Sequence, residues 1–244
     1  MPPRERRAIS DEYLAGRRVP LSPMRRAVAR NMLASWQAAP QFSLTRDVDM
    51  TAVLELRRIL APSFAASRGV KLSPVDFLIQ AAARALAAHP DLNATFTDEG
   101  LVHHDTVDVG LATATEDGGL LVPVVRGADR LTLVEIAARR QELVELARRG
   151  RLAPDAVGGT FTISNLGPFD VDRFHAIVQP GETAILAVGR IQERPAVREG
   201  QLCVRPLLTI TLTVDHRAAD GAAAARFLQD LVARLERDEG WLLF

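Results

Sequence analysis

The sequence predicts a single α+β domain. Patterns typical of helices and of strands both occur, but they do not alternate with the steady strand–helix rhythm of a doubly wound fold. A hydrophobic content of 48% with 25% charged residues is that of an ordinary globular protein. A chain of 244 residues is long enough to bury a substantial core, and it shows no internal repeat and no Pro/Gly-rich linker that would divide it.

Five segments have the sequence pattern of helices. The first begins at Ser22, a cap candidate followed by a proline, and carries Met24, Val28, Met32 and Trp36 at steps of four. This spacing predicts an amphipathic helix with one apolar face. Helices are expected over 22–36, 52–66, 73–89 and 131–148, and in the segment that follows Asp220.

Strands are expected between these helices. Short runs of alternating or β-branched residues, bounded by turn residues, predict them. The predicted strands cover 42–48, 94–96, 101–103, 107–113, 120–125, 159–167, 183–188 and 204–214. The basic residues 1–18 have little apolar periodicity and are interpreted as an N-terminal arm or linker remnant, which leaves 19–244 as the folded domain.

Charge and cysteine content narrow the classes of partner. The chain has 30 Lys and Arg against 30 Asp and Glu, so nothing in the charge favours nucleic acid or an anionic membrane surface. Cys203 is the only cysteine, which excludes an intrachain disulfide and a cysteine-based zinc site, and no other metal-ligand pattern is present. The N-terminus does not resemble a signal peptide and no apolar run is long enough to span a bilayer. We therefore expect a cytoplasmic protein.

The stretch from Thr209 to Phe227 holds the first candidate catalytic residue. A predicted strand ends at Val214, and His216 follows it, four residues before Asp220-Gly221 and an Ala-rich helix. A histidine held at the end of a strand suits a general base, whose geometry matters before its pKa. The alternative is a surface turn in which Asp220 caps the helix and His216 is only a polar side chain.

The second candidate is Ser164, in the segment Thr162-Ile163-Ser164-Asn165. On a strand, Thr162 and Ser164 share one face, and Ser164 lies beside a glycine-containing loop. No base stands within the motif, so Ser164 suits the role of hydroxyl donor to an oxyanion better than that of nucleophile. The alternative is a serine that satisfies a turn. The GxSxG, Walker and HExxH patterns are all absent.

Six ordered motifs resemble the catalytic domain of the 2-oxo acid dehydrogenase dihydrolipoamide acyltransferases, which are relatives of chloramphenicol acetyltransferase. The motifs are VPLSPMRRAVARNM, KLSPVDFLIQAAARALAAHPDLNA, EDGGLLVPVVRGAD, GGTFTISNLGPFDVDRF, AILAVGRI and DHRAADGA. They occur in the family's order from about residue 19 to the end of the chain, so the resemblance covers nearly all of it. This combination is far more specific than a lone HxxxDG.

The resemblance implies a fold and an assembly. It implies a chloramphenicol acetyltransferase-like two-layer sandwich, in which helices pack on one face of a mixed sheet, and a homotrimer with active sites between subunits. Ser164 and His216 would then come from different chains. Family members also assemble trimers into cages through an apolar C-terminus, for which Trp241-Leu-Leu-Phe244 is suitable, although this tail could instead pack on its own subunit.

The resemblance also implies a chemistry. His216 would take the proton from the thiol of coenzyme A or dihydrolipoamide, Ser164 would donate to the oxyanion, and Asp220 would support the histidine. Coenzyme A would be a substrate, and the lipoyl group would arrive as a swinging arm on another, lipoyl-bearing domain, with dehydrogenase subunits as further partners. The family's coenzyme contacts fall on Arg57 (or its neighbour Arg58), Ser73, Ser164, Asn165 and Gly189.

Several positions depart from the family. Gln41 stands where a histidine usually follows the proline, Asp170 and Gly181 replace a common glycine and proline, and Ala114 replaces a frequent acidic residue. The last change weakens one coenzyme contact and leaves acyl specificity open. The 244 residues contain no lipoyl or subunit-binding domain ahead of the catalytic motifs, so we expect either a catalytic core excised from a longer protein or a stand-alone acyltransferase. Two alternatives to the complex-bound acyltransferase are therefore a stand-alone acyltransferase with another thioester donor or acceptor, and a non-catalytic structural core.

Overall fold

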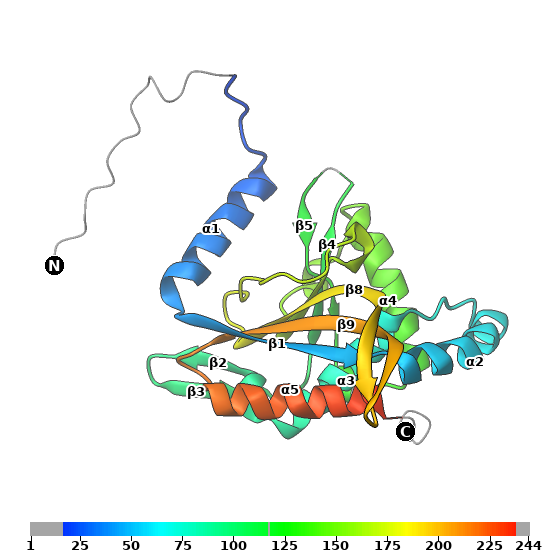
Figure 1. Ribbon diagram of the computed structural model, residues 1–244. Helices are drawn as coiled ribbons and strands as arrows, with labels where there is room; N and C mark the ends of the chain where they lie inside the picture. The colour runs from blue at the N-terminus through cyan, green and yellow to red at the C-terminus, as the bar shows by residue number, and fades with distance from the viewer. Residues whose placement is uncertain (1–16, 117, 238–244) are drawn as a thin grey trace.

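The computed structural model describes residues 17–116 and 118–237. Five α-helices and nine strands make up the regular structure of this part (Figure 1). The helices are α1 (Pro23–Ala38), α2 (Thr51–Arg68), α3 (Pro74–Ala88), α4 (Leu133–Arg148) and α5 (Gly221–Glu236). The strands are β1 (Gln41–Asp49), β2 (Ala94–Thr97), β3 (Gly100–His103), β4 (Val109–Ala114), β5 (Leu120–Leu121), β6 (Val124–Val125), β7 (Phe161–Asn165), β8 (Ala184–Arg198) and β9 (Gln201–Asp215).

The main sheet is mixed and has seven strands. Its order is β1-β9-β8-β7-β4-β5, and β6 also pairs with β4. The central pairs β4–β7 and β7–β8 are parallel, whereas the remaining pairs are antiparallel. Strands β2 and β3 form a separate hairpin. The α+β class and the mixed sheet predicted from the sequence are confirmed.

The two faces of the main sheet differ in chemistry because side chains alternate along each strand. One face is apolar and joins the core, with Leu212 and Val214 of β9 and Ile163 of β7 fully buried on it. The opposite face carries hydroxyl groups, and we call it the hydroxyl face. It includes Ser43 and Thr45 of β1, Thr162 and Ser164 of β7, and Thr211 and Thr213 of β9.

Helices cover the apolar face of the sheet. Helix α3 is the central one: it contacts α2, α4 and α5, and Phe77, Ile79 and Leu86 are completely buried. Ser73 caps it, and the Ser73 N–H donates a hydrogen bond to the Asp76 carboxylate, so the sequence signal Ser-Pro-Val-Asp forms a capping box. The expected two-layer arrangement, with helices on one face of the sheet, is present.

Strands β8 and β9 extend further than the sequence analysis predicted. The apolar patterns predicted strands over 183–188 and 204–214 only. In the structure the paired ladder continues beyond these ranges to a tight turn at Glu199 and Gly200. Both turn residues have positive φ, of 51° and 77°, as the right-handed twist of a two-residue hairpin requires. Polar residues and Pro195 concealed this extension in the sequence.

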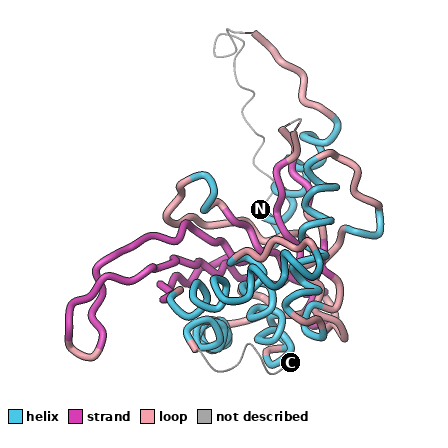
Figure 2. Tube along the Cα trace, turned by 90° about the vertical axis from the view of Figure 1, so that its right-hand side faces the viewer, coloured by secondary structure: helices cyan, strands magenta, loops and turns pink. Residues whose placement is uncertain are grey.

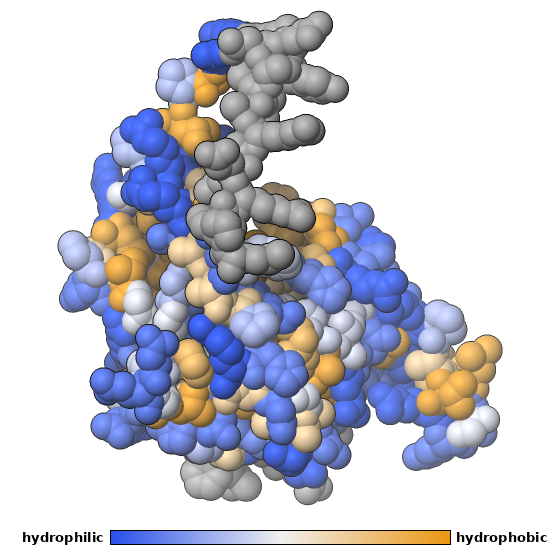
Figure 3. All heavy atoms as spheres, turned by 90° about the vertical axis from the view of Figure 1, so that its left-hand side faces the viewer, coloured by the Kyte–Doolittle hydropathy of each residue, from blue (hydrophilic) through white to orange (hydrophobic). Residues whose placement is uncertain are grey.

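The outer part of this hairpin, residues 192–206, projects from the body (Figure 2). Over this length the two strands pair only with each other, since β7 pairs with 185–188 and β1 with 207–215. Val197, Leu202 and Val204 expose 68%, 79% and 66% of their surface. Figure 3 shows an apolar group at the end of the segment that projects at its right.

The strand predicted over 120–125 is wrong as a single element. The structure contains two short strands, β5 and β6, separated at Val122 and Pro123. Proline has no N–H to donate to a ladder, and the Pro123 carbonyl instead accepts a hydrogen bond from the Leu111 N–H. The other predicted helices and strands are present with small shifts of their ends.

Helix α1 stands apart from the helical layer (Figure 1). The predicted amphipathic helix forms, but Ser35 is its only buried residue and Trp36 exposes 65% of its surface. In the described ranges, no helix is both long and apolar enough to cross a membrane. The tail Trp241–Phe244 lies outside the described residues, as does most of the expected arm 1–18.

Candidate active site

His216 lies on an exposed turn directly after β9. Its N–H donates to the Pro40 carbonyl at 2.9 Å, which ties the turn to the start of β1. The imidazole packs against Phe42, with ring centroids 4.7 Å apart. Within the described residues the ring makes no hydrogen bond, so both its nitrogens are open to a ligand or to another chain.

The residues on either side of His216 fix the turn. Asp215 is almost completely buried, and Arg217 donates to its carboxylate through Nε (3.0 Å) and Nη2 (2.7 Å). The Arg217 N–H also donates to Asp215 Oδ1, and the guanidinium lies 4.4 Å from the Phe96 ring centroid. A bidentate pair of this kind restricts orientation as well as distance.

Asp220 caps α5. Its Oδ1 accepts a hydrogen bond from the Ala223 N–H at 2.7 Å. This bond, with smaller contributions from the Ala222 N–H, Arg226 and His216, lowers the pKa of the Asp220 carboxyl. The helix-capping alternative is therefore present in the structure. It does not exclude a supporting role, because the capped carboxylate still lies near His216.

Ser164 lies near the end of β7 on the hydroxyl face. In the sheet register its neighbours are Ala112 on β4 and Ala187 on β8, so small side chains flank its partly exposed hydroxyl. No hydrogen bond occupies this hydroxyl within the described residues. It is free to donate to a ligand that approaches this face.

Ser164 and His216 do not meet in one chain. In the register, Ser164 of β7 lies beside Ala187 of β8, which in turn lies beside Thr211 of β9. Ser164 is therefore two strands away from β9. His216 lies five positions beyond Thr211, so the Cα atoms of Ser164 and His216 are about 20 Å apart, from standard strand spacings. An oxyanion donor and a base must both lie within about 3 Å of the reacting atoms. A site that uses both requires two chains.

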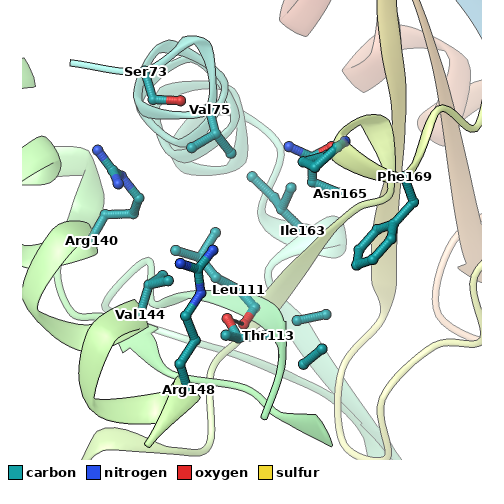
Figure 4. A pocket seen from close by; sticks show the side chains of 13 residues that line it. Ser73, Val75, Leu111, Thr113, Arg140, Val144, Arg148, Ile163, Asn165 and Phe169 are labelled. Carbon is teal, nitrogen blue, oxygen red and sulfur yellow. Dashed lines mark hydrogen bonds between the residues drawn. The ribbon is translucent and has the colours of Figure 1, made fainter. Parts of the chain in front are cut away.

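Three of the predicted coenzyme contacts lie together around the N-terminus of α3. A cavity of about 360 Å³ is lined by Ser73 and Asn165, together with apolar side chains (Figure 4). An adjacent cavity of about 280 Å³ shares Ser73 and Asn165 and adds Gly189. Asn165 Oδ1 accepts a hydrogen bond from the Gly167 N–H, which leaves the amide nitrogen for a ligand.

The other two predicted contacts lie elsewhere. Arg57, on α2, donates through Nε to the Leu72 carbonyl at 3.0 Å and lines a neighbouring cavity with Lys71. Ser164 faces the opposite side of the sheet from Asn165, because consecutive strand residues point in opposite directions. Ser164 and Asn165 therefore contact different regions of any ligand.

The cationic residues near these cavities differ in their availability. Arg140 is held by the fully buried Asp76, with Nε–Oδ1 at 2.7 Å and Nη2–Oδ2 at 3.1 Å. Arg190 is paired with Asp170 and Asp172. Arg148 points into the larger cavity from α4 (Figure 4), and in the described part of the chain it has no ion-pair partner. The sequence analysis did not single out Arg148, because it is one of many arginines on a polar helix.

The loop after β7 forms one wall of the cavities and packs tightly on β8. A Cβ on Gly189 would lie 1.9 Å from the Asp172 carbonyl oxygen, so only glycine fits there. Asp170 has a φ of 62°, which explains why glycine is common at this position of the family. Its ion pair with Arg190 offsets part of the strain that aspartate introduces.

Metal binding has no support in this part of the molecule. Among residues 17–116 and 118–237, no three His, Cys, Asp or Glu side chains cluster closely enough to hold an ion.

The chain was compared with known proteins. A family model described as "2-oxoacid dehydrogenases acyltransferase (catalytic domain)" matches residues 14–243. The chain belongs to this family. The resemblance seen in the six motifs is confirmed.

Among curated relatives, the acetyltransferase component of the acetoin cleaving system of Bacillus subtilis is 37% identical over 92% of this chain. The succinyltransferase component of the 2-oxoglutarate dehydrogenase complex of Haemophilus influenzae is 33% identical over 90%. The chain spans only 56% and 54% of these two relatives. It thus corresponds to about half the length of the curated proteins that it matches.

Solved structures agree with the fold. The cubic core of a pyruvate dehydrogenase multienzyme complex superposes with a TM-score of 0.90 at 35% identity, over 97% of this chain and 98% of that one. A probable dihydrolipoamide acetyltransferase from Listeria monocytogenes gives 0.89 at 32% identity, over 95% and 100%. The predicted fold class of the family is therefore confirmed.

Proposed function

We propose that this chain transfers an acyl group between dihydrolipoamide and coenzyme A, with His216 as general base and Ser164 as oxyanion donor. Family membership supports this reaction type. A solved structure addresses the roles of a serine, a histidine and an asparagine in the mechanism of Azotobacter vinelandii dihydrolipoamide acetyltransferase, with a TM-score of 0.90. The serine and histidine there are 52 positions apart and the asparagine follows by four, spacings that Ser164, His216 and Asp220 reproduce.

The proposed reaction is a direct transfer between two sulfur atoms. A thiol has a pKa near 8.5, so only a few per cent is thiolate at neutral pH, and His216 removes its proton as attack begins. The sulfur attacks the thioester carbon, and Ser164 donates its hydroxyl hydrogen to the oxyanion that forms. The oxyanion then collapses, the original C–S bond breaks, and the leaving sulfur takes the proton back from His216. No acyl-enzyme is required.

The observation that carries this proposal is the separation of about 20 Å between Ser164 and His216 in one chain, from the strand register. The mechanism needs both residues at one thioester, so each site is built from two copies. A homotrimer with three such sites fits this requirement, because a cyclic arrangement brings one chain's β9 turn to the next chain's β7. The unpacked helix α1 and the projecting hairpin supply surface for such contacts.

Coenzyme A is proposed to occupy the cavities at the N-terminus of α3. Ser73 and Asn165 supply polar groups beside apolar walls, and the absence of a side chain at Gly189 lets a ligand approach the backbone. Arg57 and Arg148 are suitable for phosphate groups, since neither has a carboxylate partner in the described residues. The thiol end would reach past the end of β7 to Ser164.

The proposed partners follow from this reaction. The acyl group would arrive on the lipoyl group of a separate lipoyl-bearing domain, and dehydrogenase subunits would supply it. Relatives are named as components of such complexes, and one similar structure is a cubic core. Assembly of trimers into a larger cage is part of the proposal, as is a cytoplasmic location.

Thioester exchange tests the activity. Purified protein is incubated with acetyl-, succinyl- or branched-chain acyl-CoA and dihydrolipoamide, and acyl-dihydrolipoamide is measured. Transfer with one of the three is expected. Failure with all three would count against this proposal and favour the stand-alone acyltransferase.

Complementation tests the shared site. The variants His216→Ala and Ser164→Ala are inactive alone, and they are produced together so that mixed trimers form. In a cyclic trimer of randomly mixed chains, about a quarter of the sites combine an intact Ser164 with an intact His216. Recovery of about that fraction of wild-type activity is expected. A mixture no more active than its parents would show that each site lies within one chain.

A further inference from the structure

Glu182 is a buried carboxyl group that the mechanism above does not use. It lies in the turn before β8, where its N–H donates to the Gln179 carbonyl, and it exposes only 8% of its surface. Its Oε1 accepts a hydrogen bond of 2.7 Å from the Thr162 hydroxyl on β7. In the sequence it stands directly before the predicted strand 183–188, in a Pro-Gly-Glu-Thr segment that has the composition of a turn.

The second oxygen of Glu182 has no partner. Oε2 is fully buried and makes no hydrogen bond within the described residues. The ionisable groups on the elements around this turn are already engaged: His104 with Thr95, and Asp215 with Arg217. At the start of β4, Asp108 is likewise paired with Arg126. No cation faces Glu182 in this part of the structure.

A buried oxygen without a partner costs far less when it is uncharged than when it carries part of a negative charge. Burial accordingly raises the pKa of Glu182 to about 7, against the smaller opposing effect of the Thr162 hydrogen bond. The carboxyl is therefore mostly protonated below pH 7 and mostly ionised above it.

Glu182 is also close to Ser164. Thr162 and Ser164 point to the same face of β7, two positions apart, which corresponds to about 7 Å. Because the carboxyl contacts Thr162 directly, it lies on the order of 8 Å from the Ser164 hydroxyl by the same strand geometry. At this distance a full charge on Glu182 acts on any charge that develops at Ser164.

We infer that Glu182 is a positioning residue whose uncharged carboxyl keeps the Ser164 side of β7 neutral, so that an oxyanion can form there. This inference rests on the proposed function. An ionised Glu182 would repel the oxyanion and slow acyl transfer on the order of tenfold, through partly screened Coulomb repulsion at this distance. A neutral carboxyl keeps its hydrogen bond with Thr162 and exerts no such repulsion.

The test compares wild type with Glu182→Gln, which keeps the shape and the Thr162 hydrogen bond but is neutral at every pH. The rate constant kcat for acyl transfer from acetyl-CoA to dihydrolipoamide is measured from pH 5.5 to 8.5. Ionisation of His216 and of the substrate thiol affects both proteins equally, so the ratio of their rates isolates Glu182. The matched control is Glu142→Gln, on the exposed side of α4.

The expected ratio of Glu182→Gln to wild type is near one at pH 5.5 and rises to about ten at pH 8.5, with a midpoint near 7. The Glu142→Gln ratio should stay near one throughout. A Glu182→Gln ratio that does not change with pH would overturn the inference while leaving the proposed function intact. A merely structural glutamate would alter the rate equally at every pH.

Thermal unfolding supplies a readout that does not depend on activity. If Glu182 is neutral in the folded protein, Glu182→Gln and wild type have similar Tm values at pH 4, and the variant becomes the more stable one as the pH rises to 8. Equal pH dependence of the two Tm values would show that the carboxyl is ionised, with a cation supplied by another copy, and would overturn the inference. Absence of acyl transfer in both proteins would overturn the proposed function and with it the effect of Glu182 on the reaction, whereas thermal unfolding would still report the charge of this carboxyl.

Discussion

The guanidinium of Arg217 forms an ion pair with the carboxylate of Asp215, and His216 lies between these two residues in the chain. Four hydrogen bonds join the two residues: Nη2–Oδ2 at 2.7 Å, Nε–Oδ2 at 3.2 Å, and two bonds of 3.0 Å to Oδ1 from Nε and from the Arg217 N–H. The turn is further tied to Pro40 by the His216 N–H. The histidine backbone therefore has little freedom, whereas its exposed ring is held only by the contact with Phe42.

Replacement of His216 with alanine should reduce acyl transfer about 10²–10⁴-fold, the usual contribution of a general base. The fold and the assembly should not change, because the ring forms no hydrogen bond within the described residues. Thioester exchange and light scattering measure the two properties. His103→Ala, which removes an exposed histidine paired with Asp91, is the control and should keep its activity. A near-normal rate for His216→Ala would remove it from the mechanism.

Arg217→Met should lower kcat and leave KM nearly unchanged. It leaves the buried carboxylate of Asp215 without its cation, which costs about 2 kcal/mol or more and loosens the turn. Urea denaturation and steady-state kinetics provide the measurements. Arg217→Lys keeps the charge but not the two-pronged geometry, so an intermediate effect is expected. Full activity in both variants would show that this pair does not orient His216.

Two substitutions separate the possible roles of Asp220. Asp220→Asn retains an oxygen that accepts the Ala223 N–H, so it should change stability and rate little. Asp220→Ala removes the cap and should reduce the free energy of unfolding by about 1 kcal/mol. If the negative charge tunes His216, the asparagine variant will instead show a shifted acid limb in its pH–rate profile. Chemical denaturation and that profile distinguish the outcomes.

Arg140→Ala should destabilise the protein by about 3 kcal/mol, since it leaves the fully buried Asp76 without its partner. Burial already raises the pKa of Asp76, and Arg140 opposes this effect. The control is Arg139→Ala, the preceding, exposed arginine of α4, which should cost less than about 0.5 kcal/mol. Equal losses in urea denaturation would argue against a structural role for the Arg140–Asp76 pair.

Glu182 should make stability depend on pH. Its folded pKa of about 7 lies above the ordinary value of 4.5, so the unfolded chain loses this proton first as pH rises. The free energy of unfolding is therefore reduced as the pH rises, with no loss below pH 4 and the full loss above pH 8. The difference between the folded and unfolded pKa values of Glu182 corresponds to a loss of about 3 kcal/mol. Denaturation of wild type and Glu182→Gln at pH 4 and pH 8 measures it. Parallel losses in both proteins would assign the effect to other groups.

Most of the fold could be predicted from local sequence patterns. Helix α3 was predictable because Ser73-Pro74 and Asp76 encode its start and its apolar residues have helical spacing. The long hairpin was not, because residues 192–206 form a ladder that covers no core and therefore carries no alternation of apolar and polar residues. The break between β5 and β6 could have been predicted, because Pro123 has no N–H to donate to a strand ladder. The apolar residues on both sides of it instead favoured one continuous strand.

The candidate site was predictable only in part. His216 and Ser164 could be found because each lies at the end of a patterned strand within a recognisable motif. Local patterns alone could not predict their separation, which followed only from the family resemblance, because it depends on which strands are neighbours and in what register. Glu182 was missed for a similar reason: its burial is decided by the packing of the turn against β7, which lies outside its own segment.

The β8–β9 hairpin makes the chain prone to aggregation before it assembles. Beyond Ile191 both outer edges of the ladder are unpaired within the described residues, and Val197, Leu202 and Val204 are exposed among polar residues, which is the kind of surface that pairs with other strands. In a newly made chain, correct association with other copies therefore competes with aggregation. Its yield in a cell should depend on how quickly it meets further copies of itself, and production at low concentration should favour removal by chaperones and proteases over accumulation of free chains.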